Sequence, residues 1–493
     1  MAVSLHDLIT SELRHFFPGP YLLALLFIIF FINRLLTPPA ELRHLPCVPV
    51  IPLLWSFISG ETENSRIKRL LLPFMQDEGE GAVLVYALGR WMVHILDPKI
   101  FKEVSDDLNQ WPKEAPPTEM LFFRFIGKTN VVLSNGKTWQ KHSKIIQSAF
   151  IRNLPIDGFS DLAEKLFKKM GEGGLIKWDD WTMRFTLDAI GTTILGYDFE
   201  ALEDDNSSFL KQYVGVMEAM ASPLYLIFPR LETLLPRHKV IKEVDSLIER
   251  FQDVLDYKRN NRGNDMLTYM LEQPGMTQEE YRDNMVTFFV AGHDTAAGAM
   301  ASLVYYLARY PEYQERARKE VIKALGNDQP NTKNLNQIPF VHACIKEALR
   351  VNTPVTNPAP RISVSGGTVQ GSNGKEYYIP PNTSIILSIT SVHCNENYWT
   401  DAGTFYPDRF LGTSASDQAR IDTLSWIPFS RGPRQCPARH FAMYELKTVA
   451  ALMLKSWEWS LPIGSPHAKG IKNGLSPFGL SSPKNLFINF QKL

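Results

Sequence analysis

Apolar residues recur at three- and four-residue spacing along most of the chain after residue 150, which is the pattern of amphipathic helices. This spacing predicts helices over 161–170, 181–195, 246–257, 278–310, 312–325 and 341–351, and an earlier helical stretch over 62–78 that Pro73 interrupts. Strand-like patterns occur over 81–97, where a hairpin turns at Leu88–Arg90, and over 362–389. The sequence therefore predicts a mainly α fold with a minor β portion.

The amino-terminal region contains an uninterrupted apolar run from Tyr21 to Ile32. Twelve helical residues cover only about 18 Å, against a hydrocarbon core of roughly 30 Å. We expect residues 1–36 to form a retained membrane anchor that uses its flanks. A cleaved signal peptide, whose apolar region has a similar length, and a helix lying in the membrane interface are the alternatives.

The residues after the apolar run suggest how the body is attached. Arg34 and Arg43 follow the run and Arg14 precedes it, an excess that weakly places the body on the cytoplasmic side. Prolines crowd positions 38 to 52 and favour an extended connector over a helix. We expect residues 37–60 to form a proline-rich hinge and residues 61–493 to form a single large catalytic domain, since no linker or low-complexity tract follows residue 60.

Composition excludes several classes of protein. Lys plus Arg number 52 and Asp plus Glu number 52, so the net charge gives no general attraction to a polyanion, and nucleic acid is not an expected partner. The four cysteines are scattered without C-x-x-C spacing, which indicates neither a disulfide framework nor a zinc site.

Cys436 has the most informative surroundings. It precedes a helix-patterned segment and stands near Arg434 and Arg439, and both the helix end and the arginines favour a thiolate. A thiolate is the form of cysteine that ligates iron. Taken alone, a lone cysteine is more often a buried structural residue, and a metal site shared with His440 lacks a second ligand pair.

Two other segments combine polar and apolar residues unusually. Within the long helix over 278–310, residues 291–295 (AGHDT) put polar groups in an apolar element. The local alternative is a threonine bonded back to a preceding carbonyl and a solvent-facing aspartate. Glu347 and Arg350 stand three apart, so they can pair on one helix face, with Arg409 as a third partner.

Together these segments resemble the cytochrome P-450 superfamily, and the resemblance covers essentially the whole chain. Residues 429–438 are similar to its haem-binding loop and residues 347–350 to its E-x-x-R helix. Residues 405–410 are similar to its P-x-R-F segment and residues 291–295 to its oxygen-activating helix.

The resemblance implies a role for each matched position. Cys436 would be the axial thiolate of a haem b iron, with Phe429 packed beside the sulfur. Arg434 and Arg361 would pair with haem propionates, and Trp139 and His142 lie in the segment similar to a helix that touches haem. Thr295 would hydrogen-bond dioxygen, Asp294 would help deliver protons, and Gly292 would leave room for oxygen. Glu347, Arg350 and Arg409 would form a buried structural triad.

Three residues depart from the family pattern. Ala438 stands where glycine is usual, which is tolerable if the backbone there avoids a positive φ. Ser143 replaces an arginine that commonly contacts a propionate, a role for which Lys144 is the substitute candidate. Ala296 replaces a second hydroxyl, so proton delivery would depend more on Asp294 and water.

The implied activity is insertion of one oxygen atom from dioxygen into a lipophilic substrate such as a steroid, terpenoid or fatty acid. Electrons would come from NADPH through NADPH–cytochrome P-450 reductase at the endoplasmic reticulum membrane, with cytochrome b5 as a further partner. A basic docking patch would comprise Lys141, Lys144, Arg431, Arg439 and Lys447. The alternatives are a haem-thiolate isomerase or dehydratase acting on peroxides, and a haem-binding sensor or carrier without turnover.

The same resemblance marks the regions expected to face the substrate. They are residues 120–125, Met217, Met220, Leu224, Tyr225, Phe228, Val355, Thr356, Leu475 and Phe478.

Overall fold

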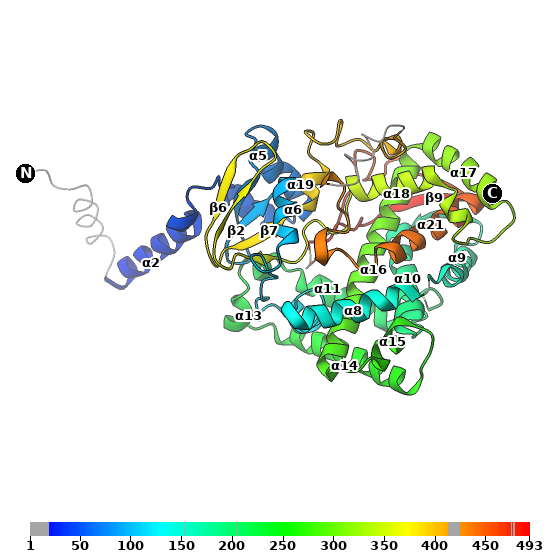
Figure 1. Cartoon of the computed structure of the whole chain (residues 1–493), viewed down its shortest axis with the longest axis horizontal. Coiled ribbons are helices and arrows are strands. Elements are labelled where there is room, and N and C mark those ends of the chain that lie inside the picture. The colour runs from blue at the N-terminus through cyan, green and yellow to red at the C-terminus, as the bar shows by residue number, and fades with distance from the viewer. Residues whose placement is uncertain (1–18, 153, 205, 413–423, 475, 477–478) are drawn as a thin grey trace, which may run out of the picture.

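One long helix, α16 (Gln278–Arg309), runs through the middle of the molecule and is buried along most of its length (Figure 1). The computed structural model describes residues 19–152, 154–204, 206–412, 424–474, 476 and 479–493. The helix begins with a capping box, because the Thr277 side chain accepts the Glu280 N–H and the Glu280 carboxylate accepts the Thr277 N–H. Its start and end agree closely with the helix predicted over 278–310.

Most of the remaining helices lie around α16 and fill the larger part of the body, whereas α2 projects away from it (Figure 1). In the first half of the chain the remaining helices are α2 (Gly19–Leu36), α3 (Val50–Ile58), α4 (Glu63–Arg66), α5 (Leu72–Gln76), α6 (Pro98–Asp106), α7 (Leu121–Ile126), α8 (Gly136–Arg152), α9 (Ile156–Met170), α10 (Trp178–Ile190), α11 (Ser208–Met220), α12 (Pro223–Ile227), α13 (Leu231–Leu234) and α14 (His238–Asn260). In the second half they are α15 (Met266–Glu272), α17 (Pro311–Leu325), α18 (Pro339–Val351), α19 (Ile389–His393) and α21 (Arg439–Ser456).

The strands form three small antiparallel or mixed sheets. They are β1 (Ala82–Ala87), β2 (Arg90–Ile95), β3 (Gly173–Lys177), β4 (Arg361–Ile362), β5 (Gly367–Gln370), β6 (Glu376–Ile379), β7 (Ser384–Leu387), β8 (Trp457–Ser460) and β9 (Phe487–Lys492). The four-stranded sheet has the order β1-β2-β7-β4, and the others are β3-β9-β8 and β5-β6. The expected hairpin is present, with Ala82 opposite Ile95 and Ala87 opposite Arg90.

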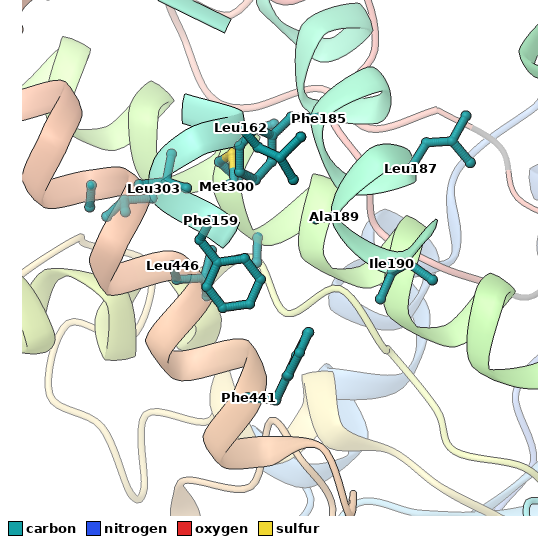
Figure 2. Packing of buried hydrophobic residues seen from close by; sticks show 14 of the residues in the cluster. Phe159, Leu162, Phe185, Leu187, Ala189, Ile190, Met300, Leu303, Phe441 and Leu446 are labelled. Carbon is teal, nitrogen blue, oxygen red and sulfur yellow. The ribbon is translucent and has the colours of Figure 1, made fainter. Parts of the chain in front are cut away.

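Helices α9, α10, α16 and α21 share the larger hydrophobic cluster. Phe159, Phe185, Met300 and Leu446 pack there (Figure 2), and Phe159 meets Phe441 edge to face at a centroid distance of 5.1 Å. A second cluster lies under the four-stranded sheet. Because α16 and α21 share one core, the segments carrying residues 291–295 and Cys436 are held by the same packing.

Residues 37–60 do not form the extended connector expected from their prolines. Helix α3 includes Pro52 in its first turn, where backbone N–H groups have no helical partner, so the proline breaks no hydrogen bond. Leu84 N–H donates to Pro46 O at 2.7 Å and Val48 N–H donates to Leu84 O at 2.9 Å. With Leu53 fully buried, this segment is part of the body.

The expected anchor can be compared only in part, because residues 1–18 lie outside the described residues. Helix α2 exposes large apolar side chains, among them Leu23, Phe27 and Phe30. Within the described part of the chain, no helix combines the length and the apolar character needed to cross a membrane.

Candidate active site

Cys436 lies in a short loop that folds back on itself just before α21. Its N–H donates to Phe429 O at 2.9 Å, and Gln435 N–H donates to Gly432 O at 3.0 Å. Gly432 has a φ of 69°, and a Cβ there would lie 2.8 Å from Asp106 Oδ1. The turn can therefore approach α6 only with glycine at this position, and it holds the cysteine half-buried.

The electrostatics of the cysteine differ from the sequence-based expectation. Burial raises the pKa of the Cys436 thiol, and the Ala438 N–H and Arg439 only oppose this effect. Arg434 points instead toward the loop over 131–135. A coordinated metal ion has the opposite effect to burial and favours the thiolate.

The backbone conformation at Ala438 explains why alanine can stand where the family pattern usually has glycine. Ala438 precedes the first residue of α21 with a φ of −89°. This conformation is open to any L-residue, so the loop has no need of glycine here.

Three cations gather beside the cysteine loop without a carboxylate partner among the described residues. Arg434 donates to Ser134 O at 2.6 Å, Arg361 donates to Trp111 O at 2.9 Å, and Lys113 donates to Ala359 O at 2.6 Å. The Nε atoms of both arginines are buried and have no hydrogen-bond partner in the described structure. The guanidinium of Arg434 also stacks 4.2 Å from the ring centroid of Trp139.

Burial lowers the pKa of all three groups, and repulsion by a neighbouring cation adds to this effect at Arg434 and Lys113. Burial lowers the pKa of Arg361 to about 10, and burial together with Arg361 lowers the pKa of Arg434 to about 9. Burial, Arg361 and Arg434 hold the pKa of Lys113 well below its usual range. A buried cation is costly without a counter-charge, so this cluster fits a ligand that carries acidic groups.

Lys113 is the member of this cluster that the sequence did not reveal. It stands in the loop before α7 and forms an isolated antiparallel bridge with Arg361. Asn135 joins it to Arg434, since Asn135 Oδ1 accepts the Lys113 N–H at 3.0 Å and an Arg434 N–H at 3.0 Å. Its Trp-Pro-Lys surroundings carry no motif, so only the long-range pairing identifies it.

The start of α16 fixes the loop to which Arg434 donates. Asp283 accepts the Thr129 N–H at 2.9 Å, and Asn284 Oδ1 accepts the Val131 N–H at 2.9 Å. Val131 O in turn accepts a hydrogen bond from Arg434 at 3.2 Å. This chain of contacts connects the position of Arg434 to helix α16.

The middle of α16 becomes accessible where residues 291–295 lie. Ala291 is exposed and Thr295 is partly exposed, although residues 284–290 are buried. The Thr295 hydroxyl donates back to Ala291 O, as the local pattern allowed. Asp294 does not face solvent, because its Oδ2 accepts the Tyr213 hydroxyl at 2.8 Å, and burial raises its pKa to about 7.

Gly292 has a packing role that the sequence did not reveal. A Cβ at this position would lie 2.4 Å from Ile190 Cδ1. Ile190 belongs to α10 and is labelled in Figure 2. The missing side chain therefore makes room for Ile190 between α10 and α16, and the role of leaving room for oxygen stays a prediction.

His142 also lies away from the cation cluster. Its buried ring places Nε2 3.2 Å from Glu280 Oε1, and burial lowers its pKa. Ser143 accepts a hydrogen bond from Gln147, and Lys144 is exposed. Lys113, rather than Lys144, is the additional buried cation.

The ion pairs expected from Glu347, Arg350 and Arg409 are present. Arg350 donates to both carboxylate oxygens of Glu347 at 2.7 Å, and Arg409 Nε donates to Oε1 at 2.9 Å. The side chains of Glu347 and Arg350 are fully buried. Arg350 also donates to His393 O at 2.7 Å and to Ala402 O at 2.8 Å, so it connects α18 to the end of α19 and to a later loop.

Two parts of the expected binding surfaces need revision. Lys447 is only 6% exposed, and Lys141 pairs with Glu280 at 2.8 Å, which removes both from a free docking patch. Of the residues expected to face substrate, Leu224 is 52% exposed at the surface. Leu475 and Phe478 lie outside the described residues.

Comparisons with known proteins identify the family to which the chain belongs. A family model described as Cytochrome P450 matches residues 45–488, and the chain belongs to the cytochrome P450 family. Cytochrome P450 4A2 of Rattus norvegicus is 27% identical, with 90% of each chain covered. Cytochrome P450 72A68 of Medicago truncatula is 27% identical over 82% of this chain and 80% of its own. The solved haem domain of cytochrome P450DA aligns with a TM-score of 0.76 at 21% identity, covering 91% and 96% of the two chains.

Membership makes the chain a haem monooxygenase, an oxidoreductase whose iron is held by a cysteine thiolate, and confirms the predicted fold. The residues present fit such a group. The buried Lys113 and Arg361 and the partly buried Arg434 lack a carboxylate partner among the described residues, and haem carries two propionates. Cys436 is the cysteine in a loop that leads into a helix beside them.

Replacing Lys113 with methionine tests the cation cluster. We expect Lys113→Met to weaken haem retention by about tenfold, since one charged contact to an acidic group is lost. The haem-free protein should unfold at no lower urea concentration, because a desolvated cation has been removed. Haem transfer to apomyoglobin and urea titration measure the two quantities. Lys144→Met is the matched control on an exposed lysine, and equal retention in both variants would exclude the assignment.

Replacing Glu347 with alanine tests the triad. Glu347→Ala leaves the buried Arg350 without its carboxylate, which costs about 3–5 kcal/mol and should prevent haem-loaded folding. The yield of holoprotein and its urea unfolding report the effect. Glu315→Ala is the control, because Glu315 is 50% exposed and its pair with Arg318 is a surface ion pair, which contributes little to stability. Normal holoprotein from Glu347→Ala would show that the triad is dispensable.

Proposed function

We propose that this monooxygenase inserts one oxygen atom into a lipophilic substrate, such as a steroid, terpenoid or fatty acid. In this proposal Cys436 is the axial ligand of haem b, and Phe429, Trp139, Arg361 and Arg434 surround the cofactor. The observation that carries the proposal is the half-buried Cys436 beside buried and partly buried cations that have no carboxylate partner in the described part of the chain. When bound, the haem supplies the activation of dioxygen, and the chain supplies orientation, protons and exclusion of water.

Thr295 and Asp294 are the residues proposed to handle protons. Thr295 occupies the accessible part of α16 with its hydroxyl already oriented by Ala291 O. Asp294 is the neighbouring carboxyl, and its pKa of about 7 lets it hold or release a proton near neutral pH. The pair favours use of dioxygen over rearrangement of a peroxide, which needs no delivered proton.

The helices near Thr295 and Asp294 support an apolar substrate. Helix α7 contributes Phe122, Phe123 and Phe125, and α11 contributes Met217 and Met220. Helix α7 packs against α16 and α14. A site with such neighbours favours a ligand that is mostly hydrocarbon.

The proposed electron source is NADPH, through NADPH–cytochrome P-450 reductase, with cytochrome b5 as a second donor. Lys144 and Arg439 are exposed and remain as basic contacts for such a partner. The test supplies holoprotein, reductase, NADPH and a panel of lipophilic compounds under isotopically labelled dioxygen. Mass spectrometry should detect one labelled oxygen atom in the product. Conversion of an added hydroperoxide without labelled oxygen would favour the isomerase, and no conversion would favour a sensor.

Replacing Thr295 with alanine tests the proton-handling role. We expect Thr295→Ala to lower product formed per NADPH by about tenfold or more, with the electrons recovered as hydrogen peroxide, because a positioned hydroxyl is lost. Peroxide, NADPH and product are measured together. Thr287→Ala, at a buried position of the same helix, is the control. Unchanged coupling in Thr295→Ala would refute the role.

We also propose that the protein binds the endoplasmic reticulum membrane with its body on the cytoplasmic side. Helix α2 exposes apolar side chains, and α3 adds Ile51 at 71%, Trp55 at 67% and Ile58 at 68% exposure. Helix α12 contacts α3, and Leu234 and Leu235 nearby in the chain are exposed as well. Such a concentration of exposed apolar residues favours an apolar partner over water.

Fluorescence quenching by brominated lipids tests this contact. Trp55 should lie within reach of the acyl chains, so Trp55→Phe should remove most of the quenching that brominated vesicles cause. Trp181→Phe, which changes a partly buried tryptophan of α10, should leave the quenching intact. Equal quenching in wild type and Trp55→Phe would contradict a membrane contact by α3.

A further inference from the structure

A buried group of polar side chains surrounds Asp294, which the family resemblance treats only as a proton donor. Tyr213 reaches it from α11, is fully buried, and donates its hydroxyl proton to Asp294 Oδ2 at 2.8 Å. The other carboxyl oxygen, Oδ1, lies 3.8 Å from His293 Nε2. The two oxygens of one carboxyl therefore face different chemical groups.

The contacts of Thr186 favour one tautomer of His293. The Thr186 hydroxyl on α10 lies 2.9 Å from Thr182 O, to which it can donate its proton. The same hydroxyl oxygen lies 2.9 Å from His293 Nδ1, and with its proton directed to Thr182 O it accepts the Nδ1–H. Burial lowers the pKa of His293 to about 3, which keeps the ring neutral. Nε2 therefore presents a lone pair, and it has no hydrogen-bond partner in the described structure.

His293 and Tyr213 have opposite effects on the protonated and the charged form of Asp294. A lone pair facing Oδ1 disfavours a charged carboxylate and suits a proton on that oxygen. The Tyr213 hydroxyl has the opposite effect, since a donor to Oδ2 stabilises the carboxylate. Tyr213 and His293 are the titratable groups that face Asp294 among the described residues, and α10 contributes only the neutral Thr186.

We propose that Tyr213 is a positioning residue for proton transfer, which fixes Oδ2 of Asp294 so that Oδ1 carries the transferable proton. The proposal rests on the proposed monooxygenase function. In each transfer Oδ1 gives up one proton, the resulting carboxylate keeps the Tyr213 hydrogen bond, and water from solvent returns one proton. Tyr213 thereby sets the pH at which Asp294 can act.

Tyr213 lies on the same helix as residues that we expect to face substrate. Met217 and Met220, which we expect to face substrate, follow Tyr213 on the same helix α11. A displacement of α11 by substrate would change the contact between Tyr213 and Asp294. The protonation of Asp294 would then respond to the presence of substrate.

The experiment is an infrared titration of the Asp294 carboxyl in the holoprotein, with the band assigned by its loss in Asp294→Asn. We expect the band to titrate near pH 7 in the wild type. Tyr213→Phe should move the midpoint upward by about one pH unit, because the carboxylate loses its donor. The pH profile of product formed per NADPH should move in the same direction.

Tyr305→Phe is the matched control. Tyr305 is also buried and donates its hydroxyl to His467 O at 2.9 Å, but it stands farther along α16. Its replacement removes an equivalent hydrogen bond and should leave the Asp294 midpoint in place. An unchanged midpoint in Tyr213→Phe, or an equal shift in Tyr305→Phe, would overturn the proposal.

A second variant tests the same proposal if Tyr213→Phe does not fold. Introducing 3-fluorotyrosine at position 213 keeps the ring and makes the hydroxyl a stronger donor, so the midpoint should move downward. A midpoint that stays in place would overturn the proposal. The infrared titration needs no turnover, whereas failure of the proposed function appears as absence of oxygenated product, so the two failures are distinguishable.

Discussion

Desolvated positive charge without a carboxylate partner among the described residues is the constraint on which the active site depends. Lys113, Arg361 and Arg434 come from three separate segments and donate mainly to carbonyl oxygens. Carbonyl dipoles only partly compensate a desolvated cation. The chain therefore folds into a state whose electrostatics are complete only when an anionic cofactor is present. The same reasoning applies to Cys436, whose ionisation is opposed by burial.

Helix α16 connects this charged region with Asp294 and Thr295, the residues proposed to handle protons. Its first turns hold the loop over 127–131 through Asp283 and Asn284, and that loop positions Arg434. Its middle carries Asp294 and Thr295. Since one rigid element bears on both faces of the site, a disturbance at its amino-terminal end should be felt at the cofactor contacts as well as in the helix. The capping box at Thr277 and Glu280 is therefore far from the chemistry but relevant to it.

Local patterns predicted the long helices and the hairpin because apolar spacing and turn residues are properties of neighbouring positions. The Glu347–Arg350 pair was predictable for the same reason. The sequence could not reveal Lys113, because its proximity to Arg361 arises from pairing between distant segments. It also misplaced residues 50–58, where prolines suggested an extended chain although Pro52 fits the first turn of a helix. His142 and Gly292 were assigned by resemblance, and their observed contacts are with Glu280 and Ile190.

The close approach of α10 to α16 at Gly292 has a consequence for how variants would be interpreted. Any larger residue there must displace Ile190 or separate two helices that share the central core. If a substitution at this position impairs the enzyme, the changed packing of α10 against α16 is already a sufficient cause. Loss of catalysis and loss of architecture would look alike in an assay of rate alone, and only the unfolding behaviour would tell them apart.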